Sequence, residues 1–171
     1  STFKLFVYTE AMNQGLTPCD KRRDEYISMQ VYDSKKHEMT TWTPGNANGS
    51  FSGDSMALKS AFAKSINSVA VRLGQEMGIK RIIETAHKMG VDSKLDDTPS
   101  LALGSSDMNL LELADSYCTV ADNGRHHAPV LVTRIVDRDG KEVYRAPEDA
   151  EQVIPYKSAF FMQQLLKGGM M

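Results

Sequence analysis

Two groups of polar residues in this sequence have types and spacings that could support acyl transfer. The first is Ser1 and Lys4, which form an S-x-x-K pattern at the start of a segment with helical periodicity. Residues three apart on a helix lie on the same face, so the hydroxyl and the amine would be neighbours. A serine hydroxyl becomes an effective nucleophile once a nearby base takes its proton. A neutral lysine amine can be that base, provided that burial or nearby positive charge lowers its pKa from about 10.4.

The second group is Ser65-Ile66-Asn67, an S-x-N pattern among turn-forming residues between two expected helices. A turn there could direct a hydroxyl that relays protons and an amide that holds a substrate peptide bond. Each pattern alone also has an ordinary interpretation. Ser1 and Lys4 could be a helix cap and a solvated lysine, and Asn67 or Ser68 could simply cap the next helix.

These residues depend on helices for their positions, and most of the chain has helical periodicity. Apolar residues at spacings of three and four, together with caps and glycine stops, predict five or six helices. The expected helices cover residues 3–14, 55–64, 69–77, 79–89, 109–123 and 155–167. The helix from Asn109 has the clearest start, because Asn109 and Glu112 form a capping-box pattern.

The remaining segments are expected to form loops and one hairpin. Residues 16–53 are polar and contain several prolines and glycines, which favours surface loops with one short strand near residues 25–32. Residues 92–106 and 146–152 are also expected to be loops. Residues 130–137 are rich in β-branched side chains, and Asp139-Gly140 is a strong hairpin signal before a return strand at 141–144. The sequence therefore predicts a mainly α fold with a small β hairpin.

The composition is that of an ordinary globular domain. The 171 residues are 41% hydrophobic and 25% charged, with a net charge of −2. One domain without a broad nucleic-acid-binding surface is therefore expected. The sequence has no apolar run of the roughly 18 residues that mark a membrane span, and no secretory signal is visible at its start.

The cysteines and histidines give no sign of a metal site or cofactor, and none is expected. Cys19 and Cys118 lie far apart in a chain that is not cysteine-rich, so a disulfide between them has only weak support. The four histidines lack metal-ligand spacing and are interpreted as solvated. They are His37, His87, His126 and His127.

Together, the two polar patterns occur in the order found in a known family. S-x-x-K followed by S-x-N resembles the set that β-lactamases and penicillin-binding proteins share. The run from Ser1 to Tyr8 resembles the segment around the nucleophile of class A (bifunctional) penicillin-binding proteins. Further similar stretches are Trp42 to Asn46 with Gly53, Ala61 to Leu73, Leu101 to Gly104, and Asn109 through Gly124 to Pro129. The resemblance covers nearly the whole chain.

This resemblance implies a peptidoglycan D,D-transpeptidase that cross-links the bacterial cell wall. The nucleophile would attack the D-alanyl-D-alanine bond of a stem peptide, and an amine of a neighbouring stem would resolve the acyl-enzyme. β-Lactam antibiotics would acylate the same serine. By motif, Ser1 would be the nucleophile, Lys4 its general base, Ser65 a proton relay and Asn67 a ligand of the substrate amide.

The resemblance also implies a location and a larger parent protein. The parent would be extracytoplasmic, on the periplasmic face of the inner membrane. It would be anchored through an N-terminal segment outside this chain, and a bifunctional parent would carry a glycosyltransferase domain upstream.

One part of the family's pattern is missing. No K-T-G triplet occurs, since Lys167-Gly168-Gly169 ends an expected helix. In the family that triplet lies on an edge strand of the central sheet and shapes the oxyanion hole. Residues 1–171 are therefore expected to be the helical part of a transpeptidase domain, an incomplete α+β fold lacking most of its central antiparallel sheet. Such a chain should be inactive alone, because loss of one oxyanion donor typically costs about 10²–10³ in rate.

Two other interpretations remain open. Ser1 could be an N-terminal nucleophile that uses its own α-amine as base, although that class requires a strand after the nucleophile and a helix is expected here. The chain could also be a non-catalytic homologue that senses β-lactams or binds a partner, although both visible motifs are intact. A K-T-G triplet downstream in the gene would favour the enzyme, and its absence would favour a binding module.

Overall fold

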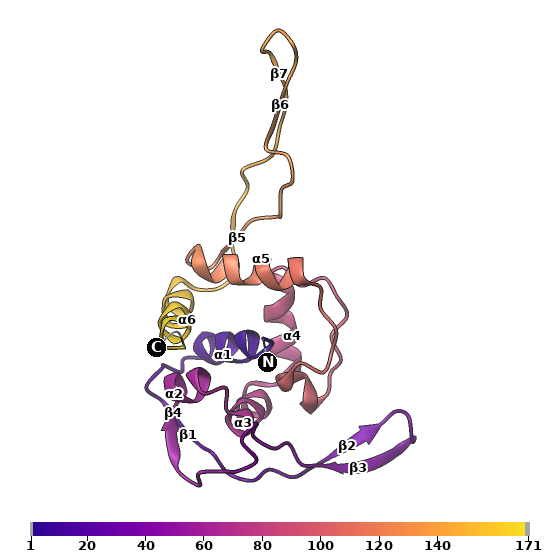
Figure 1. Ribbon diagram of the computed structural model, residues 1–171, viewed down its shortest axis with the longest axis vertical. Helices are drawn as coiled ribbons and strands as arrows, with labels where there is room; N and C mark the ends of the chain where they lie inside the picture. Colours follow the sequence, from indigo (N-terminus) through magenta and orange to yellow (C-terminus); the bar gives the residue numbers. More distant parts are fainter. Residues whose placement is uncertain (1, 170–171) are drawn as a thin grey trace.

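A single helix, α1 (Lys4–Asn13), runs through the middle of the molecule, and the other helices surround it (Figure 1). The computed structural model describes residues 2–169. Every residue of α1 from Lys4 to Met12 is buried. The helix packs against α3 (Asn67–Met77), α4 (Ile79–Lys88) and α6 (Tyr156–Gly168). The central helix therefore has no solvated face, unlike the amphipathic helices usual at a protein surface.

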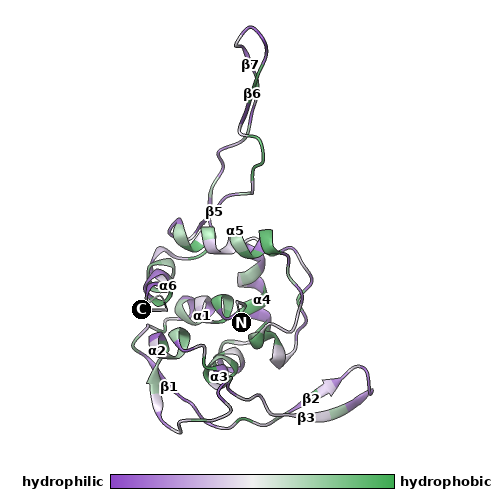
Figure 2. Cartoon of the chain, in the orientation of Figure 1, coloured by the Kyte–Doolittle hydropathy of each residue, from purple (hydrophilic) through white to green (hydrophobic). Residues whose placement is uncertain are grey.

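The remaining helices complete the shell around α1. α2 (Leu58–Ala63) and α5 (Leu110–Ala121) both contact α6, and the short 3-10 helix η1 (Pro99–Leu103) packs on α3. Hydrophobic residues concentrate on these helices (Figure 2). The core includes the fully buried side chains of Phe6, Leu73, Ile82, Leu101 and Met162.

The strands between residues 2 and 169 form four separate two-stranded sheets rather than one sheet. All four pairs are antiparallel. They are β1 (Lys21–Arg23) with β4 (Ser55–Ala57), β2 (Met29–Asp33) with β3 (Glu38–Trp42), β5 (Arg125–His126) with β8 (Glu151–Gln152), and β6 (Arg134–Val136) with β7 (Glu142–Arg145). The fold is thus mainly α, as predicted, with little β structure in this part of the chain.

The predicted hairpin is confirmed, and it lies at the tip of a long projection (Figure 1). All residues from 127 to 145 are exposed, and we call this segment the arm. Its turn is local: Oδ1 of Asp137 accepts hydrogen bonds from the backbone N–H groups of Asp139 and Lys141, each at 2.9 Å. Gly140 supplies the left-handed conformation, with φ 81°.

The helix predictions agree with the structure to within a few residues, with one exception. Residues 55–57 were expected to begin a helix, but they pair with β1 as strand β4, and α2 begins at Leu58. The one short strand expected near residues 25–32 is present as β2, displaced by a few residues. The expected loops also contain short elements that the sequence did not indicate: β1 and β3 within 16–53, η1 within 92–106, and β8 within 146–152. The turn of β2–β3 escaped prediction because His37, not glycine, adopts the left-handed conformation, with φ 53°.

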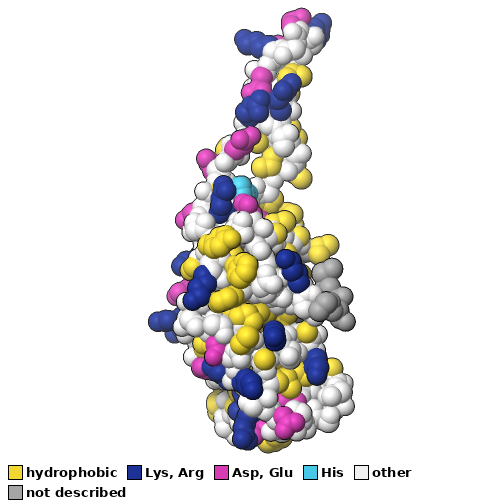
Figure 3. Space-filling view, turned by 90° about the vertical axis from the view of Figure 1, so that its left-hand side faces the viewer, with side chains coloured by type: hydrophobic (Ala, Val, Ile, Leu, Met, Phe, Trp, Pro, Cys, Tyr) yellow, Lys and Arg dark blue, Asp and Glu magenta, His cyan; other side chains and the backbone are white. Residues whose placement is uncertain are grey.

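Hydrophobic side chains gather on the face that carries α6 (Figure 3), where Tyr156 and Phe160 are exposed. Cys19 and Cys118 are both free and exposed, so no disulfide joins them. None of the helices formed by residues 2–169 is long and apolar enough to cross a bilayer.

Candidate active site

The amine of Lys4 is held by three oxygen atoms of the S-x-N turn. Nζ donates to the carbonyl oxygen of Ser65 at 2.8 Å, to Oγ of Ser65 at 2.9 Å and to Oδ1 of Asn67 at 2.6 Å. Lys4 itself is only 3% exposed. Three predicted site residues therefore meet at one place, although the turn lies some sixty residues from Lys4 along the chain. The fourth, Ser1, lies outside the described residues.

Burial gives this lysine an unusual proton affinity. Burial lowers the pKa of Lys4 from its ordinary value of 10.5 to about 8. The loss of surrounding water destabilises the charged ammonium form more than the neutral amine. The direction agrees with the requirement for a lysine base. A substantial fraction of the amine is therefore neutral near pH 8 and can accept a proton.

The turn itself holds Ser65 in a strained backbone conformation. Ser65 has φ 52°, in the left-handed region that favours glycine. Its N–H bonds to the carbonyl of Phe62 and the N–H of Ile66 bonds to the carbonyl of Ala61, both at 3.0 Å, which closes the end of α2. A non-glycine residue in this region typically costs about 1–3 kcal/mol. The strain accompanies an arrangement in which both the carbonyl and the hydroxyl of Ser65 face Lys4.

Asn46 caps the helix that follows the turn. Its Oδ1 accepts the backbone N–H groups of Asn67 at 3.0 Å and Ser68 at 3.1 Å, the first two residues after Ile66 at the start of α3. The ordinary alternative, in which Asn67 or Ser68 caps α3, is wrong, because the N-cap position is Ile66 and its side chain makes no capping bond. The side chain of Asn67 instead joins Lys4 to the carbonyl of Gly45, to which its Nδ2 donates at 2.9 Å.

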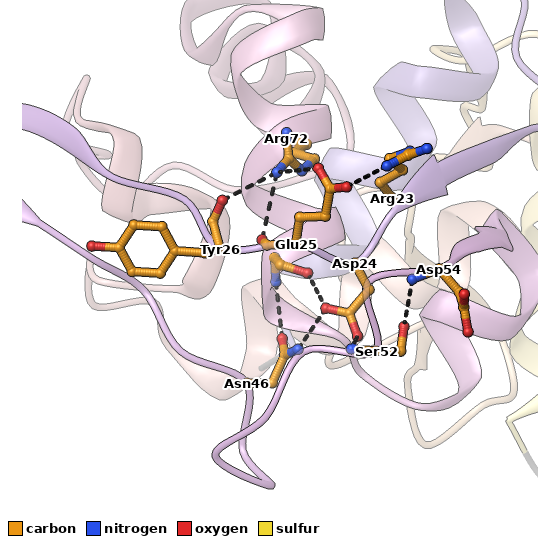
Figure 4. Close-up of polar contacts among 9 residues, drawn as sticks. Arg23, Asp24, Glu25, Tyr26, Asn46, Ser52, Asp54 and Arg72 are labelled. Atoms are coloured by element: carbon orange, nitrogen blue, oxygen red, sulfur yellow. Dashed lines mark hydrogen bonds and ion pairs between the residues drawn. The ribbon is translucent and has the colours of Figure 1, made fainter.

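Asp24 is a buried carboxylate behind this cap (Figure 4), and it was not among the predicted site residues. Its Oδ1 accepts from Nδ2 of Asn46 at 2.7 Å and from Oγ of Ser68 at 2.6 Å, and its Oδ2 accepts from the N–H of Ser52 at 2.9 Å. Burial alone would raise the pKa of Asp24, but the hydrogen bonds from Ser68, Ser52 and Asn46 outweigh it and lower the pKa. Only the W-x-P-x-N stretch that contains Asn46 hinted at this network.

A second group of titratable residues lies away from Lys4, at the base of the arm. A cavity of about 610 Å³ there is lined by His87, Glu112, Asp115, His126 and Glu151, among others. Nε2 of His126 lies 2.7 Å from Oδ2 of Asp115, so the interpretation of His126 as simply solvated is wrong. Within residues 2–169, no three His, Cys, Asp or Glu side chains are grouped so that they could hold a metal ion.

The sequence is similar to a known protein family and to several of its members. A family model described as the penicillin binding protein transpeptidase domain matches residues 1–169. Penicillin-binding protein 2D of Bacillus subtilis is 30% identical over 98% of this chain and 24% of its own length. Penicillin-binding protein 1A of Neisseria meningitidis is 30% identical over 98% of this chain and 21% of its own length. The chain thus spans no more than about a quarter of these curated relatives.

Solved structures show the same fold. The crystal structure of penicillin-binding protein 1A from Haemophilus influenzae has a TM-score of 0.87 at 25% identity, covering 99% of this chain and 29% of that chain. The PonA1 protein from Mycobacterium tuberculosis in complex with penicillin V has a TM-score of 0.76 at 20% identity, covering 93% of this chain and 43% of that chain. The helical body described above is therefore an arrangement that known structures share.

Proposed function

Because this chain belongs to the transpeptidase domain family of class A penicillin-binding proteins, we propose that it carries the nucleophile and proton-transfer residues of a peptidoglycan D,D-transpeptidase. The observation that supports this proposal most strongly is the contact of Lys4 with the S-x-N turn. A buried lysine with a pKa of about 8 lies 2.9 Å from a serine hydroxyl that can pass on its proton. These are the groups that acyl transfer through a serine ester requires.

The proposed acylation begins when the neutral amine of Lys4 takes the proton of the Ser1 hydroxyl. The Ser1 oxygen forms a bond to the carbonyl carbon of the D-alanyl-D-alanine peptide, and the C–N bond to the terminal D-alanine breaks. The proton passes from Lys4 through Oγ of Ser65, which lies 2.9 Å from Nζ, to the leaving amine. A side-chain acid–base pair of this kind contributes about 10²–10⁴ in rate.

In the second half of the proposed reaction, an amine of a neighbouring stem peptide attacks the serine ester. A new amide bond forms as the ester bond breaks, and the proton of the attacking amine returns to the Ser1 oxygen through the same residues. A β-lactam would react in the first step, because opening of its ring also forms an ester with Ser1. Asn67 is proposed to bind the substrate amide.

We further propose that residues 1–171 are the helical part of a larger transpeptidase domain. The sequence has no K-T-G triplet, and Tyr156 and Phe160 on α6 remain 63% and 44% exposed. Such aromatic side chains are suited to packing against the rest of a domain. The intact protein is proposed to lie on the periplasmic face of the inner membrane, anchored through an upstream segment.

Labelling with a fluorescent penicillin tests this function. We expect the intact protein that contains this chain to become labelled on Ser1, and Ser1→Ala to abolish the label. The isolated 171-residue chain should react at least 10²-fold more slowly, because the oxyanion donors of the K-T-G strand are missing. An intact protein that stays unlabelled, or that is labelled equally after Ser1→Ala, would refute the proposal.

A second candidate left open by the sequence is a non-catalytic homologue that binds β-lactams or a partner, which the absence of a K-T-G triplet downstream in the gene would favour. Such a protein could hold penicillin without forming an ester. Denaturation before electrophoresis separates the two, because only a covalent label survives. The structure speaks against the third interpretation, an N-terminal nucleophile, because helix α1 begins at Lys4 where that class would need a strand.

A further inference from the structure

A buried carboxylate lies behind the S-x-N turn, and the proposed reaction does not use it. Asp24 follows strand β1, and Asn46 follows strand β3. We propose that Asp24 and Asn46 are positioning residues, which fix the turn so that Ser65 and Asn67 stay on the amine of Lys4. This inference rests on the proposed function and adds two residues to its machinery.

A continuous series of hydrogen bonds joins the carboxylate to the lysine; its first link is visible in Figure 4. Oδ1 of Asp24 accepts from Nδ2 of Asn46 at 2.7 Å. Oδ1 of Asn46 accepts the backbone N–H groups of Asn67 and Ser68 at 3.0 and 3.1 Å. Oδ1 of Asn67 in turn accepts from Nζ of Lys4 at 2.6 Å. A change in the position of Asp24 would therefore alter, through these hydrogen bonds, the position of the Asn67 oxygen that contacts Lys4.

The carboxylate of Asp24 determines which way the amide of Asn46 points. An ionised carboxylate only accepts hydrogen bonds, so the NH₂ end of Asn46 must face it. The carbonyl end is then left for the start of α3, where backbone N–H groups need an acceptor. Asp24 also bonds to Ser68 in the first turn of α3, where the helix dipole favours negative charge. An amide at position 24 would place a donor against another donor.

The strain at Ser65 makes this support necessary. A left-handed serine persists only where its surroundings hold it. Without the cap from Asn46, the turn can relax and the oxygens of Ser65 can leave Lys4. Water would then reach the amine, and the pKa of Lys4 would rise from about 8 toward its ordinary value of 10.5. The base would be protonated over a wider pH range, so acylation would need a higher pH.

The test is the pH dependence of penicillin acylation in the intact protein. For Asp24→Asn we expect acylation at neutral pH to slow by roughly 10- to 100-fold, because small misplacements of reacting groups have effects of this size. The midpoint of the acid limb should also move to higher pH. The matched control is Asp54→Asn, which removes an exposed carboxylate from the residue whose backbone carbonyl accepts the N–H of Asp24, and which should keep the wild-type rate and midpoint.

A reciprocal double variant strengthens the test. Asp24→Asn combined with Asn46→Asp keeps an amide and a carboxylate in contact and leaves an acceptor at the start of α3. We expect it to recover at least part of the lost rate and to return the midpoint toward the wild-type value. A residue that only stabilised the fold would lower the amount of labelled protein without moving the midpoint, and that outcome would overturn the proposal.

Failure of the proposed function can be distinguished from failure of this inference. If the wild-type protein takes no penicillin, the function fails, and the role of Asp24 is read from an NMR titration of Lys4 in the same protein. The titration midpoint should still rise in Asp24→Asn. An unchanged midpoint in that variant would show that the network does not position the lysine.

Discussion

The S-x-N region and the arm differ in what holds them in place. Lys4 and Asp24 are each 3% exposed, and their contacts come from residues distant in sequence. The arm is exposed throughout, with Leu131 fully accessible, and its polar contacts are local, such as the 2.6 Å pair of Glu142 and Arg145. Groups that must keep a fixed geometry thus lie where many distant segments meet. The conformation of the arm follows from its own turn.

The largest expected difference is in reactivity. Lys4→Met should reduce penicillin acylation of the intact protein by about 10²–10⁴-fold, because it removes the proposed base while keeping an apolar side chain of similar length. The same substitution at Lys59, which is exposed on α2, should leave the rate within about twofold. The acylation rates of the two variants are measured by labelling with a fluorescent penicillin. A Lys4→Met protein that reacts like Lys59→Met would remove the lysine from the mechanism.

The free energy of unfolding of two leucine variants also measures the difference between the buried core and the exposed arm. Leu73 is fully buried on α3, whereas Leu131 in the arm is fully exposed. Leu73→Ala should lower the free energy of unfolding by about 2–5 kcal/mol through lost burial and a residual cavity. Leu131→Ala should change it by no more than about 0.5 kcal/mol. Urea denaturation of both variants provides the comparison, and similar losses would mean that the arm packs on the body in solution.

Substitution of two glycines, one at the base of the arm and one at its tip, should show a smaller difference in stability. Both have positive φ, 89° at Gly124 and 81° at Gly140. A Cβ on Gly124 would clash with the carbonyl oxygen of Ile154, whereas a Cβ on Gly140 would meet nothing within 4 Å. Gly124→Ala should therefore cost about 2–4 kcal/mol from overpacking and strain, and Gly140→Ala about 1 kcal/mol from strain alone. Thermal unfolding of the two variants measures the difference, and equal shifts would place the base of the arm outside the packed body.

The same difference explains what could be predicted from the sequence. The capping box of Asn109 and Glu112 was predictable and is present, because its hydrogen bonds join residues three apart. The turn at Asp137 to Gly140 was equally local. The bond of Asp24 to Ser68 spans 44 residues, and nothing in the surrounding sequence marks that aspartate. Strands β1, β4, β5 and β8 were missed because two or three residues carry no periodicity, and only their pairing defines them.

The candidate site was predictable in part because its motifs have recognisable spacing. Lys4, Ser65 and Asn67 were named from sequence, and the structure brings them together. Their supports were not named, since the cap on α3 comes from Asn46, 21 residues before Asn67.

The proposed mechanism depends on burial of Lys4 beside the S-x-N turn, which lowers the pKa of its amine so that it can act as a base near neutral pH. The most direct measurement is an NMR titration of the Lys4 side chain in the intact protein. A midpoint at about pH 8 is predicted, with acylation rising over the same range as the amine becomes neutral. A midpoint at the ordinary lysine value of 10.5 would contradict the account, because almost all of the amine would then be protonated at the pH where the reaction is proposed to run.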